Sequence, residues 1–181
     1  MRCTQVIGAV LLGCVLATHA TTAADKAEIT KDSQAALASL YAKVPAAKAI
    51  GDKATAVLVF PKVTKAGLGI GGLHGTGALL KGGQATAFYD TSGGSIGLQA
   101  GVQTYGYALF FMNQKALQAL DAAKGFEIGV GPSVVVVDEG KATQLTTTTM
   151  KDDVYAFIFG QKGLMAGIGI QGNKLTKTNP K

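Results

Sequence analysis

After residue 24, the hydrophobic positions first recur at the spacing of a helix. Over residues 25–53 the charged side chains Lys26, Asp32 and Lys43 alternate with apolar ones at intervals of three and four. The apolar positions are Ile29, Ala36, Leu37, Leu40, Tyr41 and Val44. Pro45 interrupts this pattern, and because proline suits the first position of a helix, a second short helix is predicted over 46–50, ending near Gly51.

From Thr55 onward the period changes to two, which is typical of strands. "TAVLVFP" predicts a strand that Pro61 ends. Further strands are predicted over 67–80, 85–90, 95–112, 126–137, 142–150, 154–159 and 164–175. Turns are predicted at "KGGQ" (81–84), "DTSGG" (90–94), "DEGK" (138–141) and "GQKG" (160–163). One helix interrupts the strands in "NQKALQALDAAKG", with Asn113 as N-cap and Gly125 as C-cap.

Many strands joined by short turns, without alternating helices, indicate antiparallel pairing. The predicted fold class is α+β and β-dominated: a Gly-rich antiparallel β-barrel or sandwich with N-terminal helices and one internal helix. The predicted strands and helices form a single domain over 25–181.

Three of the predicted strands place their glycines on one face. Gly67, Gly69 and Gly71 alternate with Leu68 and Ile70, and the same alternation recurs in "GSIGLQAGVQ" and "GLMAGIGIQG". Glycine weakens a strand, so its use on one face indicates close approach of another group, or strong curvature. Two interpretations are open: packing of a helix or curled sheet, or a groove for a lipid chain or another extended partner.

The first residues are typical of an export signal. Arg2 precedes the apolar stretch "VIGAVLLGCVL", and small residues follow it. Residues 1–24 are therefore predicted to be a signal peptide, cleaved after Ala20, Ala23 or Ala24, with a periplasmic or secreted mature protein. "LLGC" also resembles a lipobox, so the alternative is an envelope protein anchored by lipidation of Cys14.

The balance of basic and acidic residues limits the classes of binding partner to be expected. The whole chain has 17 Lys and Arg against 11 Asp and Glu, a net charge of +6. Without Arg2, 16 lysines against 11 acids leave +5, and no arginine remains. The absence of arginine argues against nucleic-acid recognition, whereas an excess of lysine suits an anionic lipid surface or solubility.

No catalytic constellation is found in the sequence. "GLGIGG" continues as a strand instead of opening a helix, which excludes a dinucleotide loop, and the phosphate-loop motif is absent. "GGSIG" matches the serine-hydrolase motif but precedes another strand, and no histidine follows it. His74 and the acidic pairs 138–139 and 152–153 are interpreted as ordinary strand and turn residues. We therefore expect no enzyme, cofactor or metal.

Three blocks, in order, resemble the SYLF domain family. They are "KATAVLVFPKVTKAGLGIGG", "GGSIGLQAGVQTYGYALFFMNQKAL" and "YAFIFGQKGLMAGIGIQG", within residues 46–175. The resemblance implies a non-enzymatic domain that binds phospholipids, phosphoinositides in eukaryotic members, and actin in some fungal members.

In that family, membrane contact is linked to a lysine-bearing amphipathic helix at the N-terminal side. The corresponding residues here are Lys26, Lys31, Lys43, Lys48, Lys53, Lys62 and Lys65. Acidic residues are interleaved with them, so a helix packed on its own sheet with a solvated lysine face is an equal alternative. The expected partner is an anionic phospholipid or membrane surface. The alternative is a structural or protein-interaction module of the envelope without specific lipid binding.

Overall fold

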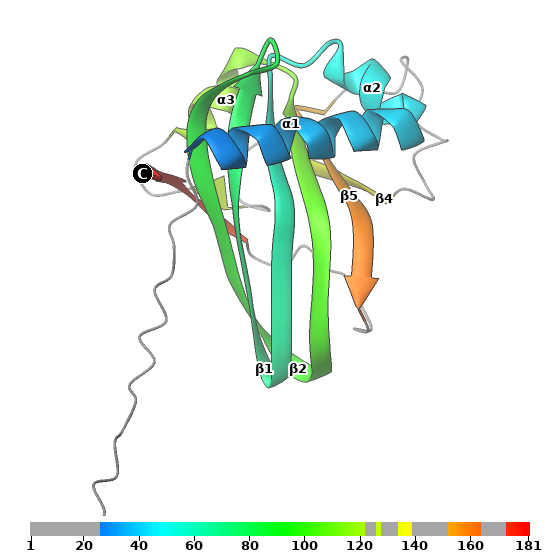
Figure 1. Cartoon of the computed structure of the whole chain (residues 1–181), viewed down its shortest axis with the longest axis vertical. Helices are drawn as coiled ribbons and strands as arrows, with labels where there is room; N and C mark the ends of the chain where they lie inside the picture. The colour runs from blue at the N-terminus through cyan, green and yellow to red at the C-terminus, as the bar shows by residue number, and fades with distance from the viewer. Residues whose placement is uncertain (1–25, 122–125, 128–133, 139–151, 164–172) are drawn as a thin grey trace, which may run out of the picture.

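The helices of the described residues lie toward one end of the molecule (Figure 1). The computed structural model describes residues 26–121, 126–127, 134–138, 152–163 and 173–181. They contain α1 (Lys26–Lys43), α2 (Pro45–Gly51) and α3 (Gln114–Leu120). Pro45 lies in the first turn of α2, as predicted, and the Asn113 side chain caps α3 by accepting from the Ala116 backbone N–H at 2.8 Å. The helix α3 ends earlier than predicted, with Asp121 and not Gly125 at its C-cap.

The strands form one six-stranded sheet, with β2 at its centre. They are β1 (Ala56–Lys81), β2 (Gln84–Phe111), β3 (Phe126–Glu127), β4 (Val134–Asp138), β5 (Val154–Gly163) and β6 (Lys174–Thr178). β1 pairs with β2 along its length, while β5 and β6 pair with the two halves of β2. All pairs are antiparallel except β4 with β5.

β1 and β2 form one long hairpin that is folded back on itself (Figure 1). Its two-residue turn consists of Gly82 and Gly83, which both have positive φ, as the predicted turn "KGGQ" requires. Both strands reverse direction near their middles, where one residue of β1, between Leu68 and Ile70, faces residues 97–99 of β2. Extra residues on one strand are the usual way to bend a two-stranded ribbon.

The reversal divides β1 into a first arm, residues 56–68, and a second arm, residues 70–81. Glycines make the reversal and the close packing of these two arms possible. A Cβ at Gly67 would lie 2.6 Å from the Cα of Gly71, and one at Gly75 would lie 2.8 Å from the Lys62 carbonyl oxygen. A Cβ at Gly77 would collide with the carbonyl of Val59. The bare face of β1 is therefore covered by the strand's own first arm. This supports the curled-sheet interpretation over the lipid groove at these positions.

Two hydrophobic cores lie on opposite faces of the sheet. The inner core includes Phe60, Tyr107 and Leu109, together with Leu117 of α3 and Leu175 of β6. The outer core lies under α1 and α2 and includes Ile29, Leu40, Ile50, Phe110 and Phe157. Helix α1 thus uses its apolar side to cover the sheet.

The α+β, β-dominated class is confirmed, but the sheet is not closed into a barrel: among the described residues, β3 and β4 end the strand order unpaired with each other. Several predicted boundaries are wrong. Pro61 does not end a strand, and "DTSGG" and "GQKG" lie within β2 and β5. The predicted signal peptide with Cys14, the strand 142–150 and most of 164–175 lie outside the described residues. So does the predicted turn "DEGK" after its first residue, Asp138, which ends β4.

Candidate functional site

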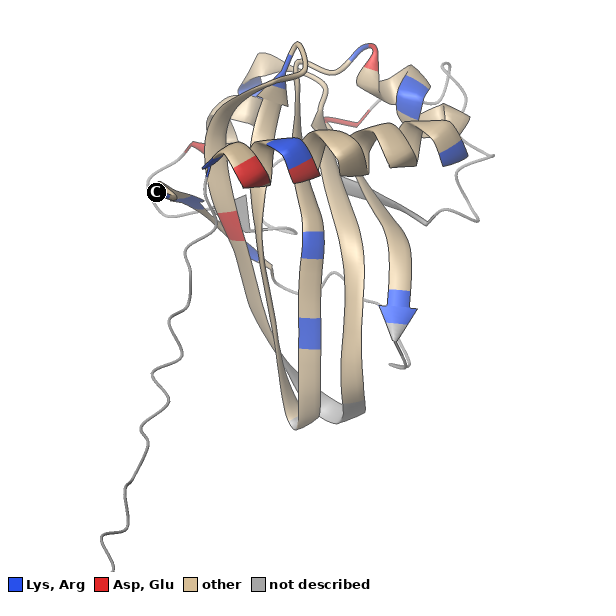
Figure 2. Cartoon of the chain, viewed as in Figure 1, with Lys and Arg blue, Asp and Glu red and all other residues tan. Residues whose placement is uncertain are grey.

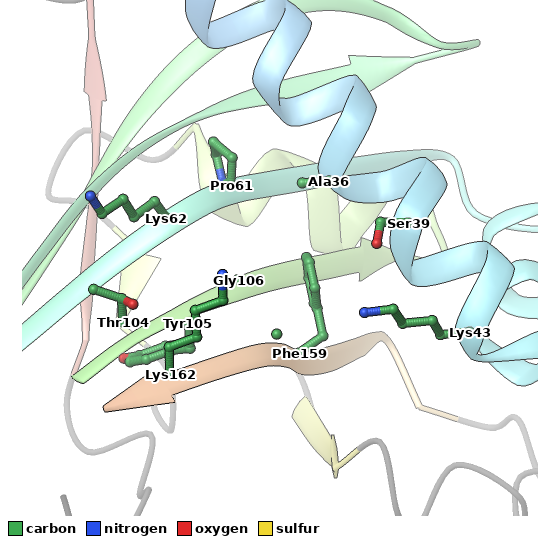
Figure 3. Close-up of a pocket in the computed structure, with 11 residues that line it drawn as sticks. Ala36, Ser39, Lys43, Pro61, Lys62, Thr104, Tyr105, Gly106, Phe159 and Lys162 are labelled. Atoms are coloured by element: carbon green, nitrogen blue, oxygen red, sulfur yellow. The ribbon is translucent and has the colours of Figure 1, made fainter. Parts of the chain in front are cut away.

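A groove of about 530 Å³ opens on the outer face of the sheet, beside the last turns of α1 (Figure 3). Its walls come from four elements: α1, β1, β2 and β5. The lining residues are Ala36, Ser39, Lys43, Pro61, Lys62, Thr104, Tyr105, Gly106, Phe159, Gly160 and Lys162. Three of these eleven are lysines and none is acidic, so we refer to this pocket as the lysine groove.

A β-bulge brings Lys62 to the outer side of β1, where it lines the edge of the groove. The register between β1 and β2 shifts between Phe60 and Val63, so that Pro61 and Lys62 together oppose one residue of β2. Proline lacks the N–H that the ladder needs, which is why it occurs in strands at such irregularities. Phe60 and Val63 both belong to the inner core, and the extra residue leaves Lys62 exposed on the outer side.

The floor of the groove depends on a glycine opposite an aromatic ring. Gly106 pairs with Phe159 across β2 and β5, and a Cβ at Gly106 would collide with the Phe159 ring. The ring therefore occupies the space where a side chain at Gly106 would lie, and Phe159 forms part of the groove lining (Figure 3). Gly160 follows with φ of 61°, a conformation that glycine adopts without strain.

The remaining two lysines line the groove from different elements, α1 and β5. Ser39 and Lys43 are one turn apart on α1 and share a face, which borders the groove. Lys162 of β5 pairs with Thr104 of β2, so these two side chains are on the same, outer face of the sheet. In Figure 3, Lys43 approaches from the α1 side, while Lys62 and Lys162 lie on the strand side.

The chemistry of these side chains suits an oxyanion. Three ammonium groups supply positive charge, and the hydroxyls of Ser39 and Thr104 are neutral hydrogen-bond donors. Burial raises the pKa of Tyr105, so this residue adds no negative charge at neutral pH. A phosphate or carboxylate in the groove would meet positive charge from more than one side, beside an apolar floor.

Of the seven lysines predicted from the sequence, the structure brings two into the groove, Lys43 and Lys62. Lys26, Lys31, Lys48 and Lys53 are exposed on α1, on α2 or just after it, and Lys48 forms an ion pair with Asp52 at 2.8 Å. Lys65 lies on the inner face, opposite Gln103, and is only 6% exposed.

Sequence reasoning missed Lys162, because "GQKG" was interpreted as a turn. Alternation alone would give Lys162 the face of the inner-core residues Ala156 and Ile158, and the register shift at residues 160–161 of β5 moves it to the outer face. The only local signal of that shift is Gly160, which has a positive φ. Pairing of β5 with β2 then places Lys162 in the lining of the same groove as Lys43, which is distant in sequence.

Within the described parts of the chain there is no group of three His, Cys, Asp or Glu residues arranged to hold a metal ion, and His74 is exposed on β1. None of the helices in those parts has the length and apolar character needed to span a bilayer.

Part of the chain matches a known protein family. Residues 92–180 match the family model described as "Ysc84: Las17-binding protein actin regulator". The matched range contains the groove residues of β2 and β5, including Lys162, whereas Lys43 and Lys62 precede it. No curated protein matches the chain.

Proposed function

Because the chain belongs to the Ysc84 (SYLF) family, whose members are binding domains for lipid and actin-related partners, we propose that it binds the headgroups of anionic phospholipids in the lysine groove. One observation carries this proposal: three lysines from three different elements line a groove that no acidic side chain lines. An exported envelope domain, as the N-terminal sequence predicts, would meet such lipids at a membrane surface.

The groove is a better candidate than the exposed face of α1. The apolar side of α1 is occupied by the sheet, through Ile29 and Leu40, so it is not free to enter a bilayer. Along its outer side, Glu28 and Asp32 alternate with Lys26 and Lys31, which cancels much of the local charge. The helix contributes instead through Lys43 at its C-terminal end.

A charge-matched pair of triple variants tests the proposal. The groove variant is Lys43→Gln, Lys62→Gln and Lys162→Gln. Its control is Lys31→Gln, Lys53→Gln and Lys115→Gln, which removes the same charge from exposed lysines that do not line the groove. Each lysine near an anionic surface contributes about 1 kcal/mol, so the groove variant is expected to bind anionic vesicles roughly a hundredfold more weakly at low salt.

The measurement is co-sedimentation of the mature protein with phosphatidylglycerol-containing vesicles and with neutral phosphatidylcholine vesicles, over a series of salt concentrations. We expect binding to the anionic vesicles only, decreasing with salt, with the control variant close to wild type. Equal losses in both variants would mean diffuse attraction without a site. Absence of wild-type binding to every vesicle would contradict lipid binding.

The family description also supports a second candidate, a protein-interaction module, because it names a protein partner. This candidate predicts that the protein binds no vesicles, anionic or neutral. It also predicts that one stoichiometric protein is recovered when the mature domain is used as bait in an envelope extract. The two candidates therefore differ in the vesicle experiment itself.

A further inference from the structure

We infer that the folded end of the β1–β2 hairpin inserts into the bilayer as an apolar tip. This inference rests on the proposed lipid binding and adds to the headgroup contact of the groove a second contact, between the tip and the acyl chains. The hairpin tip is defined here by Leu68, Ile70 and Val102. Helix α1 covers the other end of the same strands, so the tip and the helices lie at opposite ends of the sheet (Figure 1).

The tip concentrates the exposed apolar surface of the described residues. Leu68 is 85% exposed, Ile70 is 74% exposed and Val102 is 58% exposed, and these are the large hydrophobic side chains found exposed in the described ranges. Elsewhere in β1 the large aliphatic and aromatic side chains are buried or partly buried. Exposed apolar side chains gathered at one place mark a contact surface, whereas scattered ones are ordinary.

The backbone geometry makes this end of the hairpin narrow. At the reversal there is no room for a Cβ between Gly67 and Gly71, so the chain turns without bulky side chains on its inside. Leu68 and Ile70 are the large side chains of this segment, and both project into solvent. A thin protrusion that ends in aliphatic side chains can enter the acyl region while displacing few lipids.

The charges above the tip fit an anionic bilayer. No Asp or Glu occurs in residues 56–81, 91–111 or 154–163, whereas Lys62 and Lys162 are exposed there. In Figure 2 the lower halves of β1 and β5 carry basic segments, and no acidic segment is seen in the lower halves of β1, β2 and β5. A bilayer is therefore favoured as the occupant, because a membrane supplies both the apolar interior and the negative headgroups.

The spacing along the strands also fits a bilayer. Lys162 lies in the row of Thr104, and Leu68 lies in the row of Ala100, four residues further along β2. Four residues span roughly 13 Å, so insertion of Leu68 by about 5–10 Å below the headgroup boundary leaves Lys162 at headgroup level. The same face of the sheet thus presents the lysine groove to headgroups while the tip enters the acyl chains.

The absence of tryptophan from the chain allows a site-specific test. Leu68→Trp places a single fluorophore at the tip, and Ala49→Trp places one at an exposed position of α2 as the matched control. With anionic vesicles we expect the emission of the tip variant to shift to shorter wavelength and to be quenched by brominated acyl chains. The α2 variant should show neither change.

A second variant measures the contribution of the tip to binding. Leu68→Gln with Ile70→Gln changes exposed side chains only, and is expected to weaken binding to anionic vesicles by on the order of tenfold or more, because binding scales with the apolar area buried. Thermal unfolding of the variant, compared with wild type, verifies that the fold is intact.

The outcomes separate this inference from the proposed function. If the wild type binds anionic vesicles but the Leu68→Trp emission is unchanged and the double Gln variant binds normally, the tip inference is wrong and the groove proposal stands. If the wild type binds no vesicle, the proposed function fails and the inference with it. If the wild type is a dimer by analytical ultracentrifugation and the double Gln variant is a monomer, the tip is a self-association surface and bilayer insertion is overturned.

Discussion

Gly77 and Gly72 differ in their surroundings although both lie in the second arm of β1. At Gly77, an added methyl group would collide with the carbonyl of Val59 and approach the Phe60 ring. At Gly72, the nearest atom is the carbonyl oxygen of Gly93, 3.8 Å away, which is an ordinary contact. Neither glycine has positive φ, so the difference between them is one of space.

We therefore expect Gly77→Ala to lower the free energy of unfolding by about 1–3 kcal/mol, as overpacking does, and Gly72→Ala to change it by less than about 0.5 kcal/mol. Urea unfolding of the two variants measures both values. Equal stabilities would contradict the assignment of Gly77 to close packing between the two arms of the hairpin.

Single residues also explain why only part of the groove could be predicted from the sequence. Lys43 and Lys62 were among the candidates because they occur near the resemblance's N-terminal helix and in "FPKV". Lys65 was among them for the same reason, but it lies three residues after Lys62, so the alternation of the strand places it on the inner face, opposite Gln103. Residue spacing alone does not reveal the bulge at Pro61, which changes the face of the residues after it relative to Val57 and Val59.

At the scale of elements, α1 acts as a cover for the sheet. Leu40 is fully buried, and Ser33 donates from its hydroxyl to the Val59 carbonyl at 3.2 Å, so the helix is attached to β1 by both apolar and polar contacts. Gln34 donates to the Gly83 carbonyl at 2.7 Å, which connects the helix with the hairpin turn. These contacts hold Lys43 in place at the edge of the groove.

Leu40→Ala is expected to lower the free energy of unfolding by about 2–5 kcal/mol, because it leaves a cavity in the outer core. Ala38→Ser, on the exposed side of the same helix, should change it by less than about 0.5 kcal/mol. Denaturant titration compares the two. A small effect of Leu40→Ala would argue that α1 is loosely attached and free to leave the sheet.

The helices were predicted more accurately than the strands. The period of 3.6 and the caps Pro45 and Asn113 are local signals, and the structure has α1, α2 and the start of α3 where those signals lie. Pro61 and "DTSGG" are turn signals in most contexts, but here they lie inside strands. A hairpin that folds back on itself needs bulges and glycines within its strands, and only long-range pairing distinguishes them from turns.

At the scale of the whole molecule, the two cores give several tyrosines an environment that disfavours the phenolate. Burial, with a smaller effect of Asp52, raises the pKa of Tyr41 to about 12. Burial also raises the pKa values of Tyr105 and Tyr107. The pKa of Tyr89 is raised by burial first and then by Asp121, to which its hydroxyl donates at 2.6 Å.

These raised values predict a loss of stability at alkaline pH. The folded protein keeps these protons above pH 10, the ordinary tyrosine value, whereas the unfolded chain releases them. The stability is therefore complete below about pH 10 and decreases as pH rises toward the folded pKa values. Urea unfolding at several pH values between about 8 and 11 measures the decrease, and a constant free energy of unfolding across this range would contradict the prediction.

Occupation of the lysine groove by an anionic headgroup, as proposed above, can be observed directly. Amide chemical-shift mapping during titration with a short-chain phosphatidylglycerol, below its micelle concentration, locates the bound lipid directly. We predict the largest shifts at the backbone amides of Thr104, Gly106, Gly160 and Lys162, with little change at Lys26 and Lys31. Shifts confined to the exposed face of α1, or none at the groove, would contradict the account.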